Sequence, residues 1–340
     1  MPDLRWAVLG AGRIGLGVLP RIADAEGCRV VAIASRHPLR AADAARASGR
    51  VSGDSTRAGC SYEDLLERDD VDAVYVALPN HLHFEWCRRL LEAGKHVLCE
   101  KPLAARGHEA EVLAAAAARN AHILTEGFMW LHHPQSARLL ELARLGDGSP
   151  IGRLRAIRSE RNVRTTDPHI LSTRLSHAMQ GGALMDIGCY PVSAALWLTG
   201  EEPRWDTLRA AATLADALPG ETGRVDDTIS FAWDFPSGVR FEAEASFSKG
   251  TGVFLELIGE RGSARTTFPY SPDPIRQSLI VNEREEIFEH GGERFTNQFA
   301  HFARAVRAEA TSLPTAEWSV VQARTIEAIR LAAGVGFPGD

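Results

Sequence analysis

The sequence predicts two domains of different class: an α/β domain with a doubly wound parallel sheet, followed by an α+β domain with an antiparallel sheet. Over the first 125 residues, short apolar runs alternate with helical patterns, which is typical of a parallel sheet covered by helices on both faces. After about residue 125, helices are followed by strand-like segments separated by turn residues. The length of 340 residues also favours two domains, which we place at residues 1–125 and 126–340.

The first domain should alternate strands with helices from its first residues onward. Its strand-like segments are rich in Val, Ile, Leu and Ala and span residues 6–9, 30–34, 73–78, 96–99 and 123–124. The helical patterns between them span residues 13–25, 40–47, 62–68, 83–93 and 108–119. Ser61, followed three residues later by Asp64, resembles a capping box at a helix start, and Gly94 stands where a helix would end.

The second domain should contain both helices and a run of strands. Helical patterns occupy residues 136–145 and 182–198, and two more close the chain at residues 295–307 and 316–332. Strand-like segments span residues 205–214, 228–234, 239–247, 252–258, 263–267 and 278–281. Turn residues at 236–238, 259–262 and 272–274 separate them, so consecutive strands are expected to run antiparallel.

The composition excludes several classes of protein. Hydrophobic residues make up 45% of the chain, so it can build a core and is not disordered. The 38 basic and 44 acidic residues give a net charge of -6, which argues against binding to nucleic acid or to an anionic membrane. No run of about 20 apolar residues could span a membrane, and no signal-peptide pattern is present. Five cysteines without a C-x-x-C pair fit a reducing compartment, so we expect a soluble cytoplasmic protein. Because the His pairs lack metal-ligand spacing, we expect no metal site.

Lysine is rare in this chain. Of the 38 basic residues only Lys95, Lys101 and Lys249 are lysines, and the other 35 are arginines. Codon bias towards Arg explains most of this ratio. Each of the three lysines nevertheless raises a question: its position could require a cation whose pKa can be adjusted, which Arg does not offer.

A glycine-rich turn follows the first predicted strand and opens the first predicted helix. It reads Gly10-Ala11-Gly12-Arg13-Ile14-Gly15, the G-x-G-x-x-G pattern of dinucleotide-binding proteins. In that pattern the first Gly permits a tight turn, the second lets the backbone approach a pyrophosphate, and the third lets helix and strand pack closely. We therefore predict a dinucleotide site that includes Gly10, Gly12, Arg13, Ile14 and Gly15.

The end of the second predicted strand indicates which dinucleotide is preferred. An Asp or Glu at this place would bind the ribose 2′-hydroxyl of NAD, but the chain has Ser35-Arg36 here and no carboxylate from residue 29 to 42. A hydroxyl beside a guanidinium suits a 2′-phosphate instead. The sequence therefore favours NADP(H), and NAD(H) would be accepted as well if Arg36 is merely a solvated cation.

Two further loops follow strands of the predicted parallel sheet. Leu78, Asn80 and His83 belong to the loop after residues 73–78, and Glu100 and Lys101 follow residues 96–99. Ligands of doubly wound folds bind beyond the carboxyl ends of the strands, so both loops are expected at the cofactor site. The proline that follows Lys101 biases that residue towards an extended or turn conformation.

Taken together, these motifs resemble those of the Gfo/Idh/MocA oxidoreductases. The segments that carry the resemblance lie along most of the chain, at residues 10–15, 78–83, 93–102, 126–130, 133–135 and 181–191. The resemblance implies a Rossmann domain joined to a C-terminal α+β domain with an open, mainly antiparallel sheet. The exposed face of that sheet is commonly an oligomer interface in the family, so a homodimer or homotetramer is expected.

The resemblance also implies catalytic residues. Family members place a Lys beside the nicotinamide, and an Asp with a His or Tyr four residues later beside the substrate; these positions correspond to Lys101, Asp186 and Tyr190. Tyr in place of His resembles the branch with glucose-fructose oxidoreductase, dihydrodiol and xylose dehydrogenases and sugar ketoreductases, whose members largely use NADP(H). Among other residues near the expected substrate pocket, we single out Trp130, Arg161 and His177.

The chemistry of these side chains suits a hydride-transfer reaction. An ordinary Tyr, with a pKa near ~10, exchanges protons poorly at neutral pH, and a nearby ammonium favours its phenolate. We therefore expect Tyr190 to act as the acid or base and Lys101 to lower the pKa of Tyr190. Asp186 would hydrogen-bond a substrate hydroxyl or orient one of the other two side chains. If the segment is α-helical, Asp186 and Tyr190 share a face, although Pro191 makes this conditional.

The sequence thus predicts an NADP(H)-dependent oxidoreductase that acts on a CH–OH or C=O group of a sugar or polyol. Two alternatives remain. The same motifs permit a trans-dihydrodiol or xylose dehydrogenase, and a dinucleotide-binding regulator without turnover would also keep the glycine-rich turn. The presence of all three predicted catalytic residues, Lys101, Asp186 and Tyr190, counts against the regulator.

Overall fold

The chain forms two compact units in a computed structural model that describes residues 2–52, 58–164, 166–250, 252–289 and 291–339. The first unit comprises Met1–Ala104, His108–Met129 and Glu293–Val320. The second comprises Ala105–Gly107, Trp130–Gly292 and Val321–Asp340. The contacts thus place Glu293–Val320 with the first unit, although the sequence suggested a simple division near residue 125.

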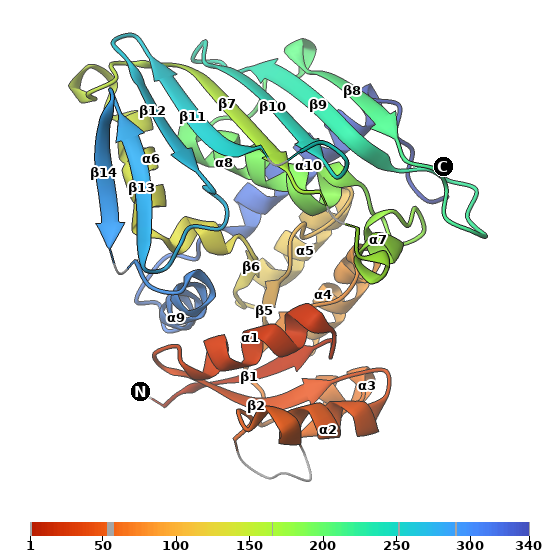
Figure 1. The fold of residues 1–340 in the computed structure, drawn as a ribbon. Coiled ribbons are helices and arrows are strands. Elements are labelled where there is room, and N and C mark those ends of the chain that lie inside the picture. Colours follow the sequence, from red (N-terminus) through yellow and green to blue (C-terminus); the bar gives the residue numbers. More distant parts are fainter. Residues whose placement is uncertain (1, 53–57, 165, 251, 290, 340) are drawn as a thin grey trace. The chain divides into compact units, whose positions relative to one another are not determined.

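The first unit contains a six-stranded parallel sheet in the order β3-β2-β1-β4-β5-β6 (Figure 1). Its strands are β1 (Leu4–Leu9), β2 (Cys28–Ala34), β3 (Gly59–Cys60), β4 (Ala73–Val76), β5 (His96–Cys99) and β6 (Leu124–Glu126). The helices that follow them are α1 (Arg13–Ala23), α2 (Pro38–Ser48), α3 (Tyr62–Leu66), α4 (His83–Glu92) and α5 (Gly107–Arg119). The prediction of a doubly wound parallel sheet is confirmed, and its strand order reverses between β1 and β4, where such folds bind ligands.

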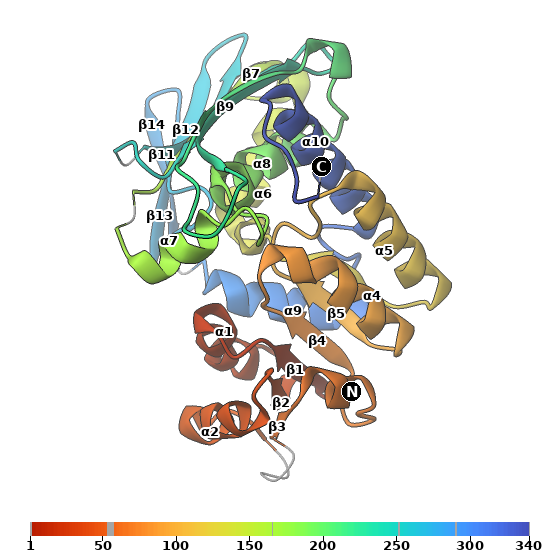
Figure 2. The same cartoon turned by 90° about the vertical axis from the view of Figure 1, so that its right-hand side faces the viewer.

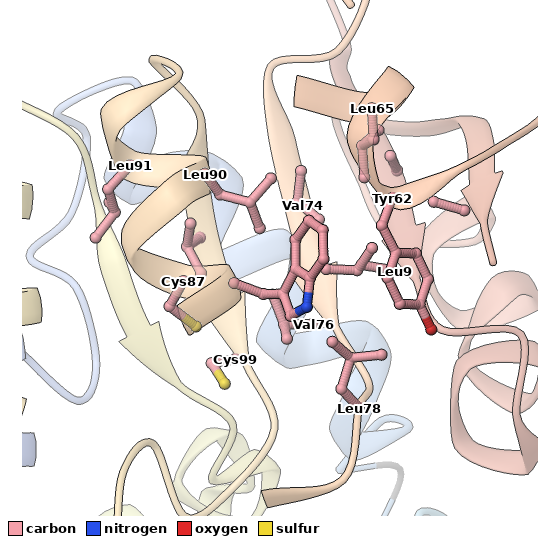
Figure 3. Packing of buried hydrophobic residues seen from close by; sticks show 14 of the residues in the cluster. Leu9, Tyr62, Leu65, Val74, Val76, Leu78, Cys87, Leu90, Leu91 and Cys99 are labelled. Atoms are coloured by element: carbon pink, nitrogen blue, oxygen red, sulfur yellow. The ribbon is translucent and has the colours of Figure 1, made fainter. Parts of the chain in front are cut away.

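Apolar side chains cover both faces of this sheet. On one face Leu9, Val74 and Val76 pack with Leu90 of α4 (Figure 3). Trp86 of α4 belongs to the same cluster. On the other, Trp6 packs against α1 and against α9 (Arg294–Val306), and its ring centroid lies 5.1 Å from that of Phe299 and 4.9 Å from that of Phe302. This packing explains why α9, late in the sequence, belongs to the first unit.

The second unit contains an eight-stranded sheet in the order β14-β13-β12-β11-β7-β10-β9-β8. Neighbouring strands run antiparallel except β7 and β10, which are parallel. The strands are β7 (Leu154–Asn162), β8 (Arg209–Leu214), β9 (Asp226–Asp234), β10 (Arg240–Ser246), β11 (Val253–Gly259), β12 (Ser263–Thr267), β13 (Arg276–Val281) and β14 (Arg284–Glu289). The prediction of an open, mainly antiparallel sheet in an α+β domain is confirmed.

Helices pack on one face of this second sheet. Figures 1 and 2 show α6 (Pro134–Arg144) and α8 (Cys189–Thr199) against the same face, and a π-helical turn, Leu184–Gly188, leads directly into α8. The remaining helices are α7 (Pro168–Arg174) and α10 (Ala316–Ala332), whose residues from Val321 onward belong to this unit. Because α8 is buried along almost its whole length, its side chains are held tightly.

The sequence missed three elements of the second unit: β7, β14 and α7. In β7, Ile157 is the one large aliphatic side chain that is fully buried, and charged residues occupy much of the strand. Strand β14 is a highly charged edge strand, a common device against edge-to-edge association. The strand predicted from residue 205 begins instead at Arg209, after the 3₁₀ turn Trp205–Thr207.

Candidate active site

The glycine-rich turn joins the carboxyl end of β1 to the first turn of α1. Gly10 has a φ of +115°, and a Cβ at that position would lie 2.5 Å from the carbonyl oxygen of Ala77. A Cβ at Gly15 would lie 1.9 Å from the carbonyl oxygen of Gly10. Both positions therefore exclude a side chain, and the tight turn depends on them.

The space beside Gly12 is open. A Cβ added to Gly12 would meet no described atom within 4 Å, although Gly12 is the N-cap residue of α1. The first turn of α1 carries no acidic residue, and the side chains of Arg13 and Ile14 are exposed. An 11-residue helix with exposed N–H groups at its start favours an anion there, so the residues present fit the pyrophosphate of a dinucleotide.

Ser35 and Arg36 follow β2 beside this turn. The backbone N–H of Gly10 donates to the carbonyl oxygen of Ala34, which brings the two strand ends together. The Ser35 hydroxyl oxygen accepts a hydrogen bond of 3.2 Å from the His37 backbone N–H, and Arg36 is exposed. Ser35 and Arg36, which are predicted to contact a ribose 2′-phosphate, thus directly follow a strand end that is hydrogen-bonded to the glycine-rich turn.

His83 joins the loops that follow β4 and β5. Its ring is fully buried, with Nε2 2.8 Å from the carbonyl oxygen of Leu78 and Nδ1 2.8 Å from that of Pro102. Burial lowers the pKa of His83. The neutral ring can donate to one of these carbonyls at a time. Because His83 contacts both loops, it helps to position the loop that carries Lys101. Asn80 lies in the 3₁₀ turn that precedes α4.

Glu100 and Glu126 surround the backbone of the Lys101 loop. Glu100 accepts hydrogen bonds from the Tyr75 hydroxyl and, at 3.3 Å, from the Lys101 backbone N–H. Glu126 is buried and accepts a 2.9 Å hydrogen bond from the Leu103 backbone N–H. Burial raises the pKa of Glu126 to about 7, and the nearby charge of Lys101 opposes this rise. The sequence indicated Glu126 only as part of a motif. It did not predict that the buried Glu126 carboxyl accepts a hydrogen bond from the Lys101 loop.

We expect Glu126→Gln to stabilise the protein in a pH-dependent way. Because burial raises the pKa of the folded state from 4.5 to about 7, ionisation of Glu126 opposes folding progressively as the pH rises through this window. Below about pH 4.5 the carboxyl is protonated in both states, so the variant gains nothing. Above about pH 7 it should gain roughly 3 kcal/mol, measured as a rise in melting temperature.

The exposed Glu67 provides the matched control for this measurement. Glu67→Gln removes the same charge without removing a buried carboxyl, so its melting temperature should follow that of the parent protein across the same pH range. A difference between Glu126→Gln and the parent that stays constant from about pH 4 to pH 8 would contradict the buried ionisation.

Asp186 and Tyr190 lie on consecutive turns of the second unit. Asp186 belongs to the π-helical turn, and its carboxylate forms an ion pair with Arg174 at 2.6 Å. Tyr190 lies in the first turn of α8, with only 4% of its surface exposed. The wide turn before α8 has a physical reason. Pro191 has no N–H to donate, and its ring would crowd the carbonyl four residues earlier in a regular α-helix.

A buried carboxylate fixes the start of this segment. Asp226 of β9 is fully buried and accepts a 2.6 Å hydrogen bond from the Leu184 backbone N–H. Gly182, with a φ of +112°, leaves room for it, because a Cβ there would lie 2.2 Å from an Asp226 carboxylate oxygen. Burial raises the pKa of Asp226 to about 6. Gly182 of the sequence motif is therefore needed to bring β9 against the turn that carries Asp186.

Arg161 and Tyr270 flank the Tyr190 ring. The guanidinium carbon of Arg161, on β7, lies 4.0 Å from the centroid of the Tyr190 ring and 5.2 Å from that of Tyr270. The two phenol rings lie 5.5 Å apart. The sequence suggested Arg161 as a residue of the substrate pocket and gave no sign of Tyr270, which lies in a loop without a motif.

The other two residues suggested for the substrate pocket have packing contacts in the second unit. Trp130 is fully buried, and its indole N–H donates to the Ser193 hydroxyl at 3.2 Å. The His177 backbone N–H donates to Glu221 at 2.6 Å, and the His177 ring fills the space beside Gly223. Trp130 therefore supports α8, which carries Tyr190, whereas His177 packs against the loop that contains Glu221 and Gly223.

The three lysines have different surroundings. Lys95 is buried and donates to the backbone carbonyl oxygens of Arg68, at 2.6 Å, and Val71, at 3.1 Å. Lys249 pairs with Glu244 on the surface of the second sheet. Lys101 follows β5, and it belongs to the first unit whereas Asp186 and Tyr190 belong to the second.

Membrane-spanning helices and metal sites are both absent from the part of the chain that the structure describes. No helix there is long and apolar enough to cross a bilayer. Among the same residues, no three His, Cys, Asp or Glu side chains gather in a way that could hold a metal ion.

Comparisons with known proteins match almost the whole chain. Residues 4–128 match the model of an oxidoreductase family with an NAD-binding Rossmann fold, and residues 139–265 match the GFO/IDH/MocA C-terminal domain. The dTDP-3,4-didehydro-2,6-dideoxy-alpha-D-glucose 3-reductase of Streptomyces antibioticus is 39% identical over 90% of this chain and 89% of its own. The D-xylose 1-dehydrogenase (NADP(+)) 2 of Haloferax volcanii is 31% identical over 98% of each chain.

A solved structure is similar over the same extent. KijD10, a 3-ketoreductase from Actinomadura kijaniata determined with NADP and TDP-benzene, superposes with a TM-score of 0.80. Its sequence is 29% identical to this one, and the match covers 97% of this chain and 98% of that chain.

Proposed function

The chain belongs to the GFO/IDH/MocA oxidoreductase family, and from this premise we propose that it transfers a hydride between NADP(H) and a CH–OH or C=O carbon of a sugar. The observation that carries the proposal is the turn between β1 and α1, where Gly10 and Gly15 exclude side chains and the space at Gly12 is open. The nicotinamide would supply the hydride chemistry once bound. The chain itself would bind the cofactor, orient the sugar and move one proton.

NADP(H) is the proposed cofactor. Ser35 and Arg36 stand beside the glycine-rich turn where NAD-specific folds carry a carboxylate. The relative from Haloferax volcanii is named for NADP(+), and the Actinomadura kijaniata ketoreductase was solved with NADP. Leu78, Asn80, Glu100 and Lys101 would border the nicotinamide end of the cofactor, with His83 linking their two loops from within.

We expect Arg36→Ala to weaken NADPH binding far more than NADH binding. Loss of a charge-assisted contact with the 2′-phosphate should raise the Kd for NADPH by about 10- to 100-fold, because such contacts contribute roughly 1.5–3 kcal/mol. The Kd for NADH should change by less than about twofold. Fluorescence titration with each dinucleotide measures both constants. Arg40→Ala, on the exposed side of α2, is the control, and equal losses for both dinucleotides with Arg36→Ala would refute the role.

Tyr190 is the proposed acid in the reductive direction and the base in the oxidative direction. Its hydroxyl would give a proton to the oxygen of the reduced carbonyl, or take one from the alcohol. Lys101 would favour the phenolate of Tyr190 through its positive charge. Asp186, held by Arg174, would orient a sugar hydroxyl.

A keto sugar is the proposed substrate, and the nucleotide-linked sugars reduced by the Streptomyces antibioticus relative are the first candidates. D-Xylose and related aldoses come next, because the Haloferax volcanii relative is a xylose dehydrogenase. A panel of dTDP-linked keto sugars, aldoses and cyclic diols, monitored by NADPH absorbance, separates reductase, xylose dehydrogenase and dihydrodiol dehydrogenase. Tight NADPH binding without turnover of any of them would favour a regulator.

The exposed face of the second sheet is the proposed interface of a homodimer or homotetramer. The opposite face is covered by α6 and α8, and the free face carries charged pairs such as Arg158 with Glu242 at 2.7 Å. Light scattering would measure the mass in solution, and a monomer at micromolar concentration would contradict this assignment.

A further inference from the structure

We propose that Arg161 is a positioning residue that stabilises the phenolate form of Tyr190 from the face of its ring. The inference rests on the proposed role of Tyr190, and it assigns to Arg161 a part in proton transfer instead of the substrate contact that the sequence suggested. It concerns residues of the second unit alone, so it does not depend on where Lys101 lies.

The geometry places a cation directly over the ring. Arg161 projects from β7, and its guanidinium carbon lies 4.0 Å from the Tyr190 centroid. Within the described residues, Arg161 forms no ion pair, and its buried Nε makes no hydrogen bond. A positive charge that no carboxylate neutralises, held at this distance, favours the charged form of a phenol.

Tyr270 is the other phenol near Arg161, but its proton is already committed. The Ser159 hydroxyl donates to the carbonyl oxygen of Phe254 at 2.8 Å, so the Tyr270 hydroxyl must be the donor in its 2.7 Å hydrogen bond with Ser159. Complete burial also raises the pKa of Tyr270. The charge of Arg161 is therefore expected to act on the ionisation of Tyr190.

Several other charged groups of this unit near α8 have partners of their own. Asp186, on the turn before Tyr190, is paired with Arg174 at 2.6 Å. On α6, Arg144 donates to the backbone carbonyl oxygens at the end of α8, and Arg138 pairs with Glu286. From α10, the neutral Gln322 side chain donates to the Cys189 carbonyl oxygen. Among these described groups, the charge over the Tyr190 ring is that of Arg161.

The ionisation of Tyr190 can be measured without a substrate. The chain has four tyrosines, and a Tyr190→Phe difference assigns one step of an ultraviolet tyrosinate titration to Tyr190. In Arg161→Gln this step should move to higher pH by about one unit. Arg161→Lys keeps the charge and should move it less, which also provides a test if the glutamine variant folds poorly. Arg158→Gln, on the same strand but on its exposed side, should leave the step in place.

The same variants separate this role from a structural or a substrate-binding one. In the oxidative direction, the limb of the kcat profile that rises with pH should shift upward in Arg161→Gln by the same amount, while KM changes little. An unmoved tyrosinate step would overturn the proposal, as would a large rise in KM for the sugar substrate with the pH profile unchanged. If the titration step moves but no substrate turns over, the proposed enzymatic function fails while the effect of Arg161 on Tyr190 stands.

Discussion

Tyr190→Phe is expected to reduce kcat by about 10²- to 10⁴-fold, the range typical of removing a general acid or base. The phenyl ring keeps the contacts with Arg161 and Tyr270, so the fold should persist. Only the hydroxyl proposed to exchange the proton is lost. Lys101→Met should cause a loss of similar size if Lys101 favours the phenolate, as proposed. In both variants, NADPH affinity should remain within about tenfold of the parent value, or roughly 1.4 kcal/mol.

Tyr270→Phe is the matched control. The centroid of the Tyr270 ring lies 5.5 Å from that of the Tyr190 ring. The variant removes the Tyr270 hydroxyl, which is hydrogen-bonded to Ser159 within the core. We expect it to lower stability by about 1 kcal/mol and to retain turnover within about tenfold. Steady-state kinetics with the substrate found in the panel measures all three variants. Retained activity in both Tyr190→Phe and Lys101→Met would contradict the proposed acid–base pair.

Gly12→Ala and Gly15→Ala should both abolish NADPH binding but differ in their effect on folding. At Gly12 a methyl group meets no described atom, so the melting temperature should stay within about 2 °C, while the methyl occupies the space proposed for the pyrophosphate. At Gly15 the same methyl would lie 1.9 Å from the Gly10 carbonyl oxygen. The turn must then distort, with an expected loss of roughly 2–4 kcal/mol, in the upper range of single substitutions.

Calorimetry with NADPH and thermal unfolding test this pair together. Gly17→Ala on α1, where a Cβ also meets no described atom, is the control and should bind NADPH normally. Normal NADPH affinity in Gly12→Ala would contradict the pyrophosphate site, whereas an unchanged melting temperature in Gly15→Ala would contradict only the packing argument.

The parallel sheet was predictable because each strand carries a strong local signal. Strands β1, β2 and β4 consist mostly of Val, Ile, Leu and Ala and are buried at nearly every position, and turn residues separate them from amphipathic helices. Strand β7 lacks this signal because polar residues occupy most of its positions, and its stability comes from neighbours distant in sequence: β10 and β11. Residues that pair across such distances leave no periodic pattern in a single sequence.

The candidate site was predictable where short motifs carry it. The glycine-rich turn and the residues Lys101, Asp186 and Tyr190 all lie in such motifs. The supporting residues Glu126 and Asp226 act through burial, which brings each to a backbone N–H distant in sequence. The burial of Glu126 and Asp226 depends on tertiary packing. A single sequence shows that they are carboxylates but does not show that they are buried.

The central claim, that this chain moves a hydride between NADPH and a sugar carbonyl, is tested most directly by isotope transfer. The protein would be incubated with NADPH deuterated at the reactive carbon of the nicotinamide and with the keto sugar, and the product analysed by mass spectrometry. We predict one deuterium on the new carbinol carbon, formed by the parent protein and about 10²- to 10⁴-fold more slowly by Tyr190→Phe. Tight NADPH binding with no deuterium in any product of the full substrate panel would contradict the claim.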